Sequence, residues 1–266
     1  MFPSEQADTT GRREPLPAHH AGPAGSATLA RMEFRRALVV FAHPDDAEFL
    51  CGGTIARWVS EGTEVSYVCA TDGSAGWNGP DRGREEIAEI REREMRQAAE
   101  ILGVADVAFL GFEDGSLQPD LLLRKAITRE ARRSRPDVMV TFDPSVRWMG
   151  RSYINHPDHL AVGDAVLAVV ACDAPTRPQF PELLEEGMEP FKVRSVWLAT
   201  DADTDTKVDI GASMGKKVEA IRAHASQIEN MGDFDVDARM REWGARAAGD
   251  DDMEYAEAFR TFGLED

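Results

Sequence analysis

Short apolar segments alternate with longer amphipathic segments along most of the chain. The apolar segments are residues 37–42, 65–70, 107–110, 138–142 and 196–199. Helical patterns occupy about 46–60, 83–102, 119–134, 158–171 and 212–230. Short, almost uniformly apolar segments are typical of strands that are covered on both faces. The alternation therefore predicts an α/β fold with a Rossmann-like, doubly wound, mostly parallel sheet.

The first part of the chain does not share this pattern. Residues 1–33 are rich in Pro, Gly, Ala and Ser and have no apolar period, which predicts a disordered N-terminal leader. Its His19 and His20 are expected to be solvated rather than to form a paired-histidine metal site. Residues 34–266 have the length of a single domain.

Composition narrows the range of partners. The chain has 30 Lys and Arg against 48 Asp and Glu, a net charge of −18. Such a chain repels phosphate backbones and anionic lipid, so we expect a small-molecule substrate and no nucleic acid. The three widely spaced cysteines (Cys51, Cys69 and Cys172) predict core residues in a reducing compartment. No apolar run of about 18 residues and no signal sequence is present, which predicts a cytoplasmic protein without membrane insertion.

Two long loops follow predicted strands, at 72–82 and 143–155. In an open α/β sheet the loops at the carboxyl ends of the strands hold the ligand. We therefore expect the active site at this edge of the sheet.

Two motifs at this edge each place histidine and aspartate around a proline: His43-Pro44-Asp45-Asp46 and His156-Pro157-Asp158-His159. The first follows the first strand, and the second opens the helix after the fourth strand. Two histidines and one aspartate form a three-ligand set with an open fourth position, as in catalytic zinc sites. Zinc in such a site lowers the pKa of bound water to about 7, and a spare carboxylate can act as general base.

The alternative interpretation is that these residues cap helices. Asp45 or Asp46 would cap the first helix, and Asn155 or Asp158 would cap the later one. One such cluster alone would favour capping. Two clusters at equivalent points of the sheet favour metal-dependent hydrolysis.

The sequence resembles the PIG-L/LmbE-like zinc N-deacetylases over about residues 36–230. The two motifs carry the resemblance, with weaker support from Thr71-Asp72-Gly73 and from Arg91, Glu94, Ala98, Leu102, Gly103, Lys217, His224, Ser226 and Gln227. The resemblance implies His43, Asp46 and His159 as zinc ligands and Asp45 as the general base. It also implies that His156 stabilises the oxyanion and that Asp158 orients His156.

Substrate contacts are expected from five further residues: Arg91, Asp72, Tyr153, His224 and Gln227. Each also has a structural interpretation. Arg91 lies in a mixed-charge run that is typical of a solvated helix face. Asp72 could cap a turn, Tyr153 and its neighbour Trp148 could pack within their loop, and a late-helix residue such as His224 is commonly structural.

The predicted function is zinc-dependent removal of an N-acyl group, in the first instance N-acetyl, from an amino sugar or its conjugate. We expect one Zn²⁺ per chain, with Fe²⁺ as a substitute, and leave open a homo-oligomer. The alternatives are an amidase for a larger amide or a thiol conjugate, and a non-catalytic sugar-binding relative. A non-haem iron oxygenase is disfavoured, because its His and Asp stand two residues apart on a barrel strand and it needs no spare base.

Overall fold

The computed structural model describes residues 34–149, 151 and 153–264, and these pack as one compact unit. The predicted leader, with His19 and His20, lies outside the described residues. All five predicted strands are present, as β1 (Arg36–Phe41), β2 (Glu64–Thr71), β3 (Asp106–Phe112), β4 (Val138–Phe142) and β7 (Ser195–Ala199).

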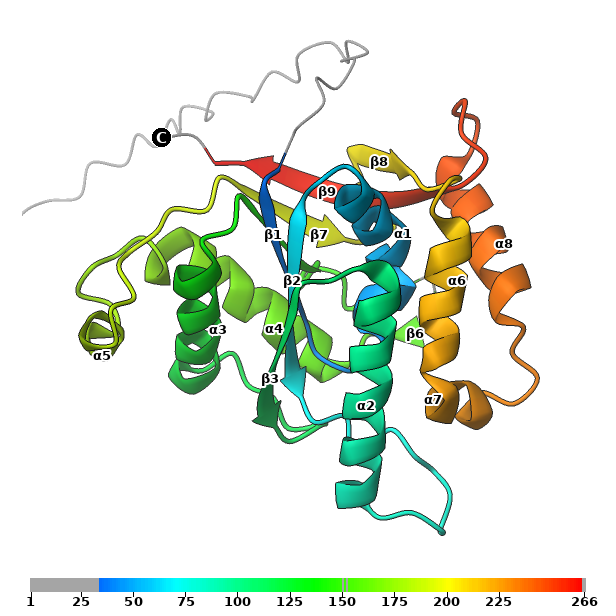
Figure 1. The fold of residues 1–266 in the computed structure, drawn as a ribbon, viewed down its shortest axis with the longest axis horizontal. Coiled ribbons are helices and arrows are strands. Elements are labelled where there is room, and N and C mark those ends of the chain that lie inside the picture. Colours follow the sequence, from blue (N-terminus) through cyan, green and yellow to red (C-terminus); the bar gives the residue numbers. More distant parts are fainter. Residues whose placement is uncertain (1–33, 150, 152, 265–266) are drawn as a thin grey trace, which may run out of the picture. The chain divides into compact units, whose positions relative to one another are not determined.

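These strands form most of one seven-stranded sheet with the order β3-β2-β1-β4-β7-β9-β8 (Figure 1). The strands from β3 to β7 in this order pair in parallel, as the sequence predicts. Two strands that were not predicted, β8 (Thr206–Asp209) and β9 (Ala256–Gly263), extend the sheet in antiparallel pairing. The prediction of a doubly wound, mostly parallel α/β sheet is confirmed.

Helices cover both faces of this sheet (Figure 1). One face carries α1 (Asp46–Ser60), α2 (Arg84–Leu102), α6 (Met214–Ala223), α7 (Ala225–Asn230) and α8 (Val236–Ala248). The other carries α3 (Leu121–Ser134), α4 (Pro157–Ala168) and the π-helical turn η1 (Val169–Asp173). The expected helix at 212–230 is two helices, because His224 has the non-helical angles φ −80° and ψ 56°.

The core forms where the apolar strands meet these two helical layers. Every residue of β4 is buried, as are five of the six residues of β1. Cys51 and Cys69 are buried free thiols, as expected. The expectation of a core position is wrong for Cys172, which is exposed, because η1 turns its neighbour Asp173 inward to pair with Arg124.

The centre of the sheet defines where a ligand can bind. Strands β1 and β4 are neighbours, but the chain leaves β1 to form α1 on one face and leaves β4 towards α4 on the other. A crevice opens at such a switch point, at the carboxyl ends of the strands. The loop after β4 contains a small hairpin, β5 (Trp148–Met149) and β6 (Tyr153–Ile154).

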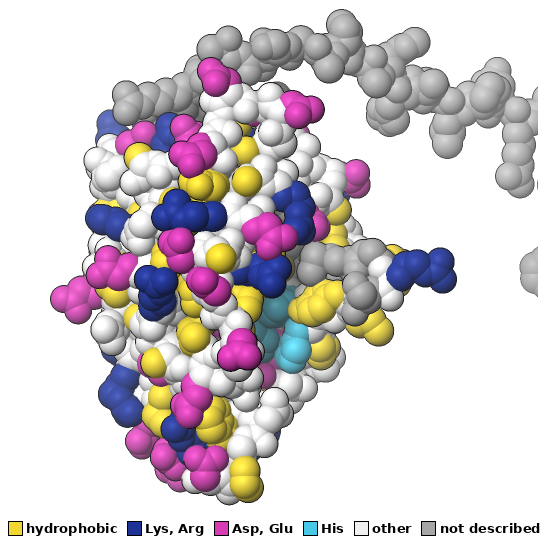
Figure 2. Space-filling model, turned by 90° about the vertical axis from the view of Figure 1, so that its right-hand side faces the viewer, with side chains coloured by type: hydrophobic (Ala, Val, Ile, Leu, Met, Phe, Trp, Pro, Cys, Tyr) yellow, Lys and Arg dark blue, Asp and Glu magenta, His cyan; other side chains and the backbone are white. Residues whose placement is uncertain are grey.

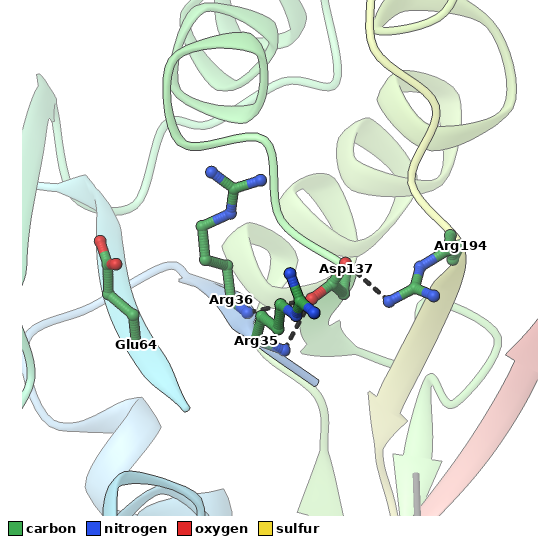
Figure 3. A pocket seen from close by; sticks show the side chains of 5 residues that line it. All are labelled: Arg35, Arg36, Glu64, Asp137 and Arg194. Carbon is green, nitrogen blue, oxygen red and sulfur yellow. Dashed lines mark hydrogen bonds and ion pairs between the residues drawn. The ribbon is translucent and has the colours of Figure 1, made fainter. Parts of the chain in front are cut away.

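The opposite edge of the sheet has a charged hollow of about 790 Å³ (Figure 3). Its lining residues stand where strands begin, and they are Arg35, Arg36, Glu64, Asp137 and Arg194. The Asp137 carboxylate accepts hydrogen bonds from two backbone N–H groups, those of Arg35 and Arg36, and pairs with Arg194. The hollow contains neither motif. No helix within the described residues is long and apolar enough to cross a membrane.

Candidate active site

The first motif forms a tight turn between β1 and α1. The Asp46 carboxylate accepts a hydrogen bond from the His43 backbone N–H at 2.7 Å, which fixes both residues at the start of α1. Asp45 between them has φ 124°, a conformation that costs a non-glycine residue free energy. The turn directs the His43 Nδ1 atom towards Asp46, 3.3 Å from its Oδ2.

The start of α4 brings His159 to the same point. Its Nε2 atom lies 3.2 Å from His43 Nδ1 and 3.3 Å from Asp46 Oδ1. Ligand atoms held at about 2.0–2.1 Å in a tetrahedral zinc site are about 3.3 Å apart. The fold therefore gathers the three predicted ligands, with the two ring nitrogens 3.2 Å apart and each of them 3.3 Å from a different oxygen of Asp46.

Two groups of neighbouring side chains in the described part of the chain have ligand atoms close enough to share a metal: His43 with His156 and His159, and His43 with Asp114 and Asp158; neither includes Asp46. In the second group the carboxylates face the other ring nitrogen, since His43 Nε2 lies 3.1 Å from Asp114 and 3.5 Å from Asp158. The Asp158 carboxylate also accepts hydrogen bonds from the backbone N–H groups of Gly115 and Leu117.

Asp114 is a buried residue of the site that the sequence analysis missed. It also accepts a hydrogen bond from the Ala75 backbone N–H. Burial raises the pKa of Asp114, but His43 and the Ala75 N–H outweigh this effect and hold it below its usual value. Its position just after β3, at the same sheet edge as both motifs, is the signal that could have identified it.

His156 is the N-cap residue of α4. Its Nδ1 accepts a hydrogen bond from the Asp158 backbone N–H at 3.2 Å, so in the neutral ring Nε2 carries the proton. Burial and the nearby charge of His43 lower the pKa of His156, which favours this neutral donor form. The Asp158 carboxylate makes no hydrogen bond to His156, so the orienting contact comes from the Asp158 backbone.

Asp45 lies beside Arg91. Arg91 is buried and donates to the backbone oxygens of Gly73 and Pro44, with one nitrogen 3.2 Å from Asp45 Oδ2. The interpretation of Arg91 as part of a solvated helix face is therefore wrong, because α2 turns it inward with Ile87 and Met95. Burial raises the pKa of Asp45, and the Arg91 charge opposes that shift.

The remaining predicted contact residues have different environments. Asp72 Oδ1 accepts hydrogen bonds from the backbones of Ser74 and Asp114, so it does stabilise a turn. Tyr153 is 44% exposed on β6. Burial and then the Asp46 charge raise the pKa of Tyr153, and the His43 charge opposes that shift.

His224 is not available to a substrate in this fold. Its side chain is fully buried and lies 3.1 Å from the equally buried Glu48, so the expected substrate contact is not met. Gln227 donates to the Gly76 backbone oxygen and thereby holds the loop after β2.

Histidine side chains reach the surface at this site, with hydrophobic side chains beside them (Figure 2). The hairpin contributes exposed apolar residues, since Trp148 is 68% and Ile154 is 84% exposed. These two residues are cross-strand partners and so lie on one face of the hairpin.

Comparison with known proteins identifies the family of this chain. Residues 38–170 match the PIG-L family, described as GlcNAc-PI de-N-acetylase. The chain is 31% identical to a probable N-acetyl-α-D-glucosaminyl L-malate deacetylase 2 of Bacillus anthracis, over 73% of this chain and 81% of that protein. It is 32% identical to diacetylchitobiose deacetylase of Thermococcus kodakarensis, over 76% and 77% of the two chains.

A solved structure extends the likeness to three dimensions. The N,N'-diacetylchitobiose deacetylase of Pyrococcus horikoshii, solved with an inhibitor, superposes with a TM-score of 0.79 and 29% identity. The match covers 87% of this chain and 85% of that one. Fold, site and relatives together define an enzyme of the deacetylase class, a hydrolase of amide bonds. The chain belongs to the PIG-L family.

Proposed function

We propose that this enzyme is a zinc-dependent N-deacetylase that hydrolyses the acetamido group of an N-acetylglucosamine conjugate. The observation that carries the proposal is that His43 Nδ1 and His159 Nε2 lie 3.2 Å apart, with Asp46 Oδ2 3.3 Å from the first and Asp46 Oδ1 3.3 Å from the second. These residues would hold the ion, and Fe²⁺ could replace it because the same nitrogen and oxygen donors suit both metals. A cytoplasmic location is part of the same proposal.

The chemistry divides between the ion and the protein. Zinc bound there would act as a Lewis acid on the amide carbonyl and on water. Asp45 accepts a proton from the water that attacks the carbonyl carbon and returns it to the departing nitrogen, which leaves as the amine while the acyl group leaves as acetate. The Nε2–H of His156 donates a hydrogen bond to the carbonyl oxygen as negative charge develops there.

Buried groups around Asp45 support this assignment. Arg91 keeps the Asp45 carboxylate within a fixed turn, and a positioned base is worth about 10²–10⁴ in rate. Asp45 is also one residue from the ligand Asp46, so a base and a ligand are held by the same turn. A non-catalytic relative would not need the spare carboxylate.

Two features support an amino-sugar substrate. The relatives named above are a probable N-acetyl-α-D-glucosaminyl L-malate deacetylase and a diacetylchitobiose deacetylase. The hairpin before the second motif exposes the aromatic residues Trp148 and Tyr153, and aromatic side chains offer an apolar platform with a polar tip.

The test is amine release by the zinc-loaded protein from N-acetylglucosamine, N,N'-diacetylchitobiose and N-acetylglucosaminyl malate. N-acetylated amino acids and a longer-chain N-acylglucosamine serve as comparison substrates. We expect a higher kcat/KM for the N-acetylated sugars than for either comparison class. A preference for non-sugar amides would contradict the proposed substrate, and no amine release from any amide would contradict the reaction itself.

A further inference from the structure

Asn155 joins the hairpin to the helix that carries His159. It follows β6 directly, and its backbone N–H donates to the Arg147 oxygen at 2.8 Å. Its side-chain Nδ2 donates to the Val146 oxygen, also at 2.8 Å. Asn155 therefore closes the base of the hairpin through both its backbone and its side chain.

The hydrogen bonds of Asn155 determine which way its amide points. A backbone carbonyl such as that of Val146 can only accept, so it must face the NH₂ group. The His156 backbone N–H can only donate, and it lies 2.9 Å from Oδ1. These two partners are incompatible with the flipped amide.

The same oxygen lies 2.9 Å from Nδ1 of His159. Because Asn155 Oδ1 can only accept, Nδ1 of His159 must carry the proton. In a neutral imidazole the lone pair is then on Nε2. That is the atom that faces His43 and Asp46.

The ring of His159 is also held from one face. It stacks on Phe142 with a centroid distance of 3.9 Å and an interplanar angle of 13°. Phe142 in turn packs edge-on against Phe41 of β1. The aromatic stack fixes the plane of the ring, and Asn155 fixes its rotation within that plane.

We propose that Asn155 is a positioning residue that sets the tautomer and orientation of His159 for metal binding. This inference rests on the proposed zinc site. Metal-binding histidines commonly donate their second N–H to an oxygen acceptor, and loss of that acceptor costs about 10–100-fold in metal affinity or activity. Asn155 supplies this acceptor from the hairpin beside the site.

The experiment measures the zinc dissociation constant by competition with a chromophoric chelator. The variants are Asn155→Leu, which removes the acceptor, and Asn155→Asp, which keeps an acceptor oxygen but loses the NH₂ donor. Asn78→Leu, at an exposed asparagine of the loop after β2, is the matched control. His159→Ala reports on the site itself.

We expect Asn155→Leu to weaken zinc binding about 10–100-fold. Asn155→Asp and Asn78→Leu should remain close to wild type. Equal affinities for Asn155→Leu and wild type would overturn the proposal, as would an equal loss in both Asn155 variants. If His159→Ala also bound zinc normally, the proposed zinc site would fail as well, which distinguishes the two failures.

A second measurement does not depend on how well the Asn155 variants fold. In the zinc-loaded wild-type protein labelled with ¹⁵N-histidine, two-dimensional NMR reports which ring nitrogen carries a proton. We expect a protonated Nδ1 and a proton-free Nε2 for His159, assigned by comparison with His159→Ala. A proton-free Nδ1 on His159 would contradict the role given to Asn155.

Discussion

One nitrogen of Arg91 donates to the backbone oxygen of Pro44 at 2.6 Å and lies 3.2 Å from the Asp45 carboxylate. Arg91 therefore contacts two consecutive residues, Pro44 and Asp45, of the turn that carries the proposed base. Both side chains are buried, so the contact is shielded from solvent. Because Asp45 has a strained backbone conformation, the contacts from Arg91 help to stabilise that conformation.

This contact predicts that Arg91→Lys lowers kcat about 10–100-fold, because lysine keeps the charge but cannot bond Gly73, Pro44 and Asp45 together. The measurement is steady-state deacetylation at saturating zinc. Arg93→Lys, on the exposed side of the same helix, is the control and should match wild type. Wild-type kcat in Arg91→Lys would show that the contacts of Arg91 with this turn have no part in catalysis.

Asp45 and Asp46 are adjacent but should give opposite phenotypes. Asp45→Asn is expected to keep one zinc per chain and to lose about 10²–10⁴ in kcat, because the proton acceptor is gone. Asp46→Asn is expected to lose zinc, because a charged ligand becomes neutral. Zinc content and turnover are measured on the same samples. Loss of zinc from Asp45→Asn, or near-normal kcat in it, would contradict its assignment as base.

A buried ion pair supports the middle of α1. Lys217 Nζ lies 2.6 Å from Glu257, whose carboxylate also accepts from the backbone N–H groups of Gly53 and Thr54. Lys217→Met leaves that carboxylate without its cation, which should reduce the free energy of unfolding by about 3–5 kcal/mol.

Urea unfolding measures this effect. Lys216→Met, at the exposed neighbouring position, should change stability by at most about 0.5 kcal/mol. Equal effects of the two substitutions would show that the buried pair contributes no particular stability.

The pH dependence of stability is predicted at the opposite edge of the sheet. Burial raises the pKa of Asp137, but hydrogen bonds from the backbones of Arg36 and Arg35 and the pairing with Arg194 lower it overall (Figure 3). A carboxyl with a lowered folded-state pKa stabilises the protein fully above its unfolded-state pKa of about 3.9. That contribution is lost as the pH falls through the folded-state pKa.

The difference in unfolding free energy between wild type and Asp137→Asn should therefore be constant above about pH 5 and shrink below about pH 4. Urea unfolding across this pH range measures it. A difference that stays the same at every pH would contradict the ionic contribution of Asp137.

The central fold could be predicted because its signal is local. The strand at 138–142 has the same bounds in sequence and structure, and so does the helix at 46–60, since each is a continuous apolar or amphipathic segment. Strand β9 was not predicted because its sequence is neither a continuous apolar segment nor a regular alternation, and it is held by pairing with β7. Its partner lies more than fifty residues away, at a distance that no local pattern reports.

The candidate site likewise contains some residues that the sequence could place and others that it could not. The residues of the two motifs lie together because each follows a central strand, which is a rule of topology. Arg91 could not be assigned because a mixed-charge helix looks solvated until the partners of its inner face are known. Asp114 and His224 owe their environments to contacts between distant segments, which spacing along the chain does not encode.

The most direct test of the account is a zinc titration of the chelator-treated protein with deacetylation measured at each step. We predict no amine release without metal. The rate of deacetylation should rise in proportion to the added zinc and reach a plateau at one zinc per chain. His159→Ala should give no such rise at the same zinc concentrations. Full activity in protein shown to contain no metal, or an identical titration for His159→Ala, would contradict the claim that His43, Asp46 and His159 hold the catalytic ion.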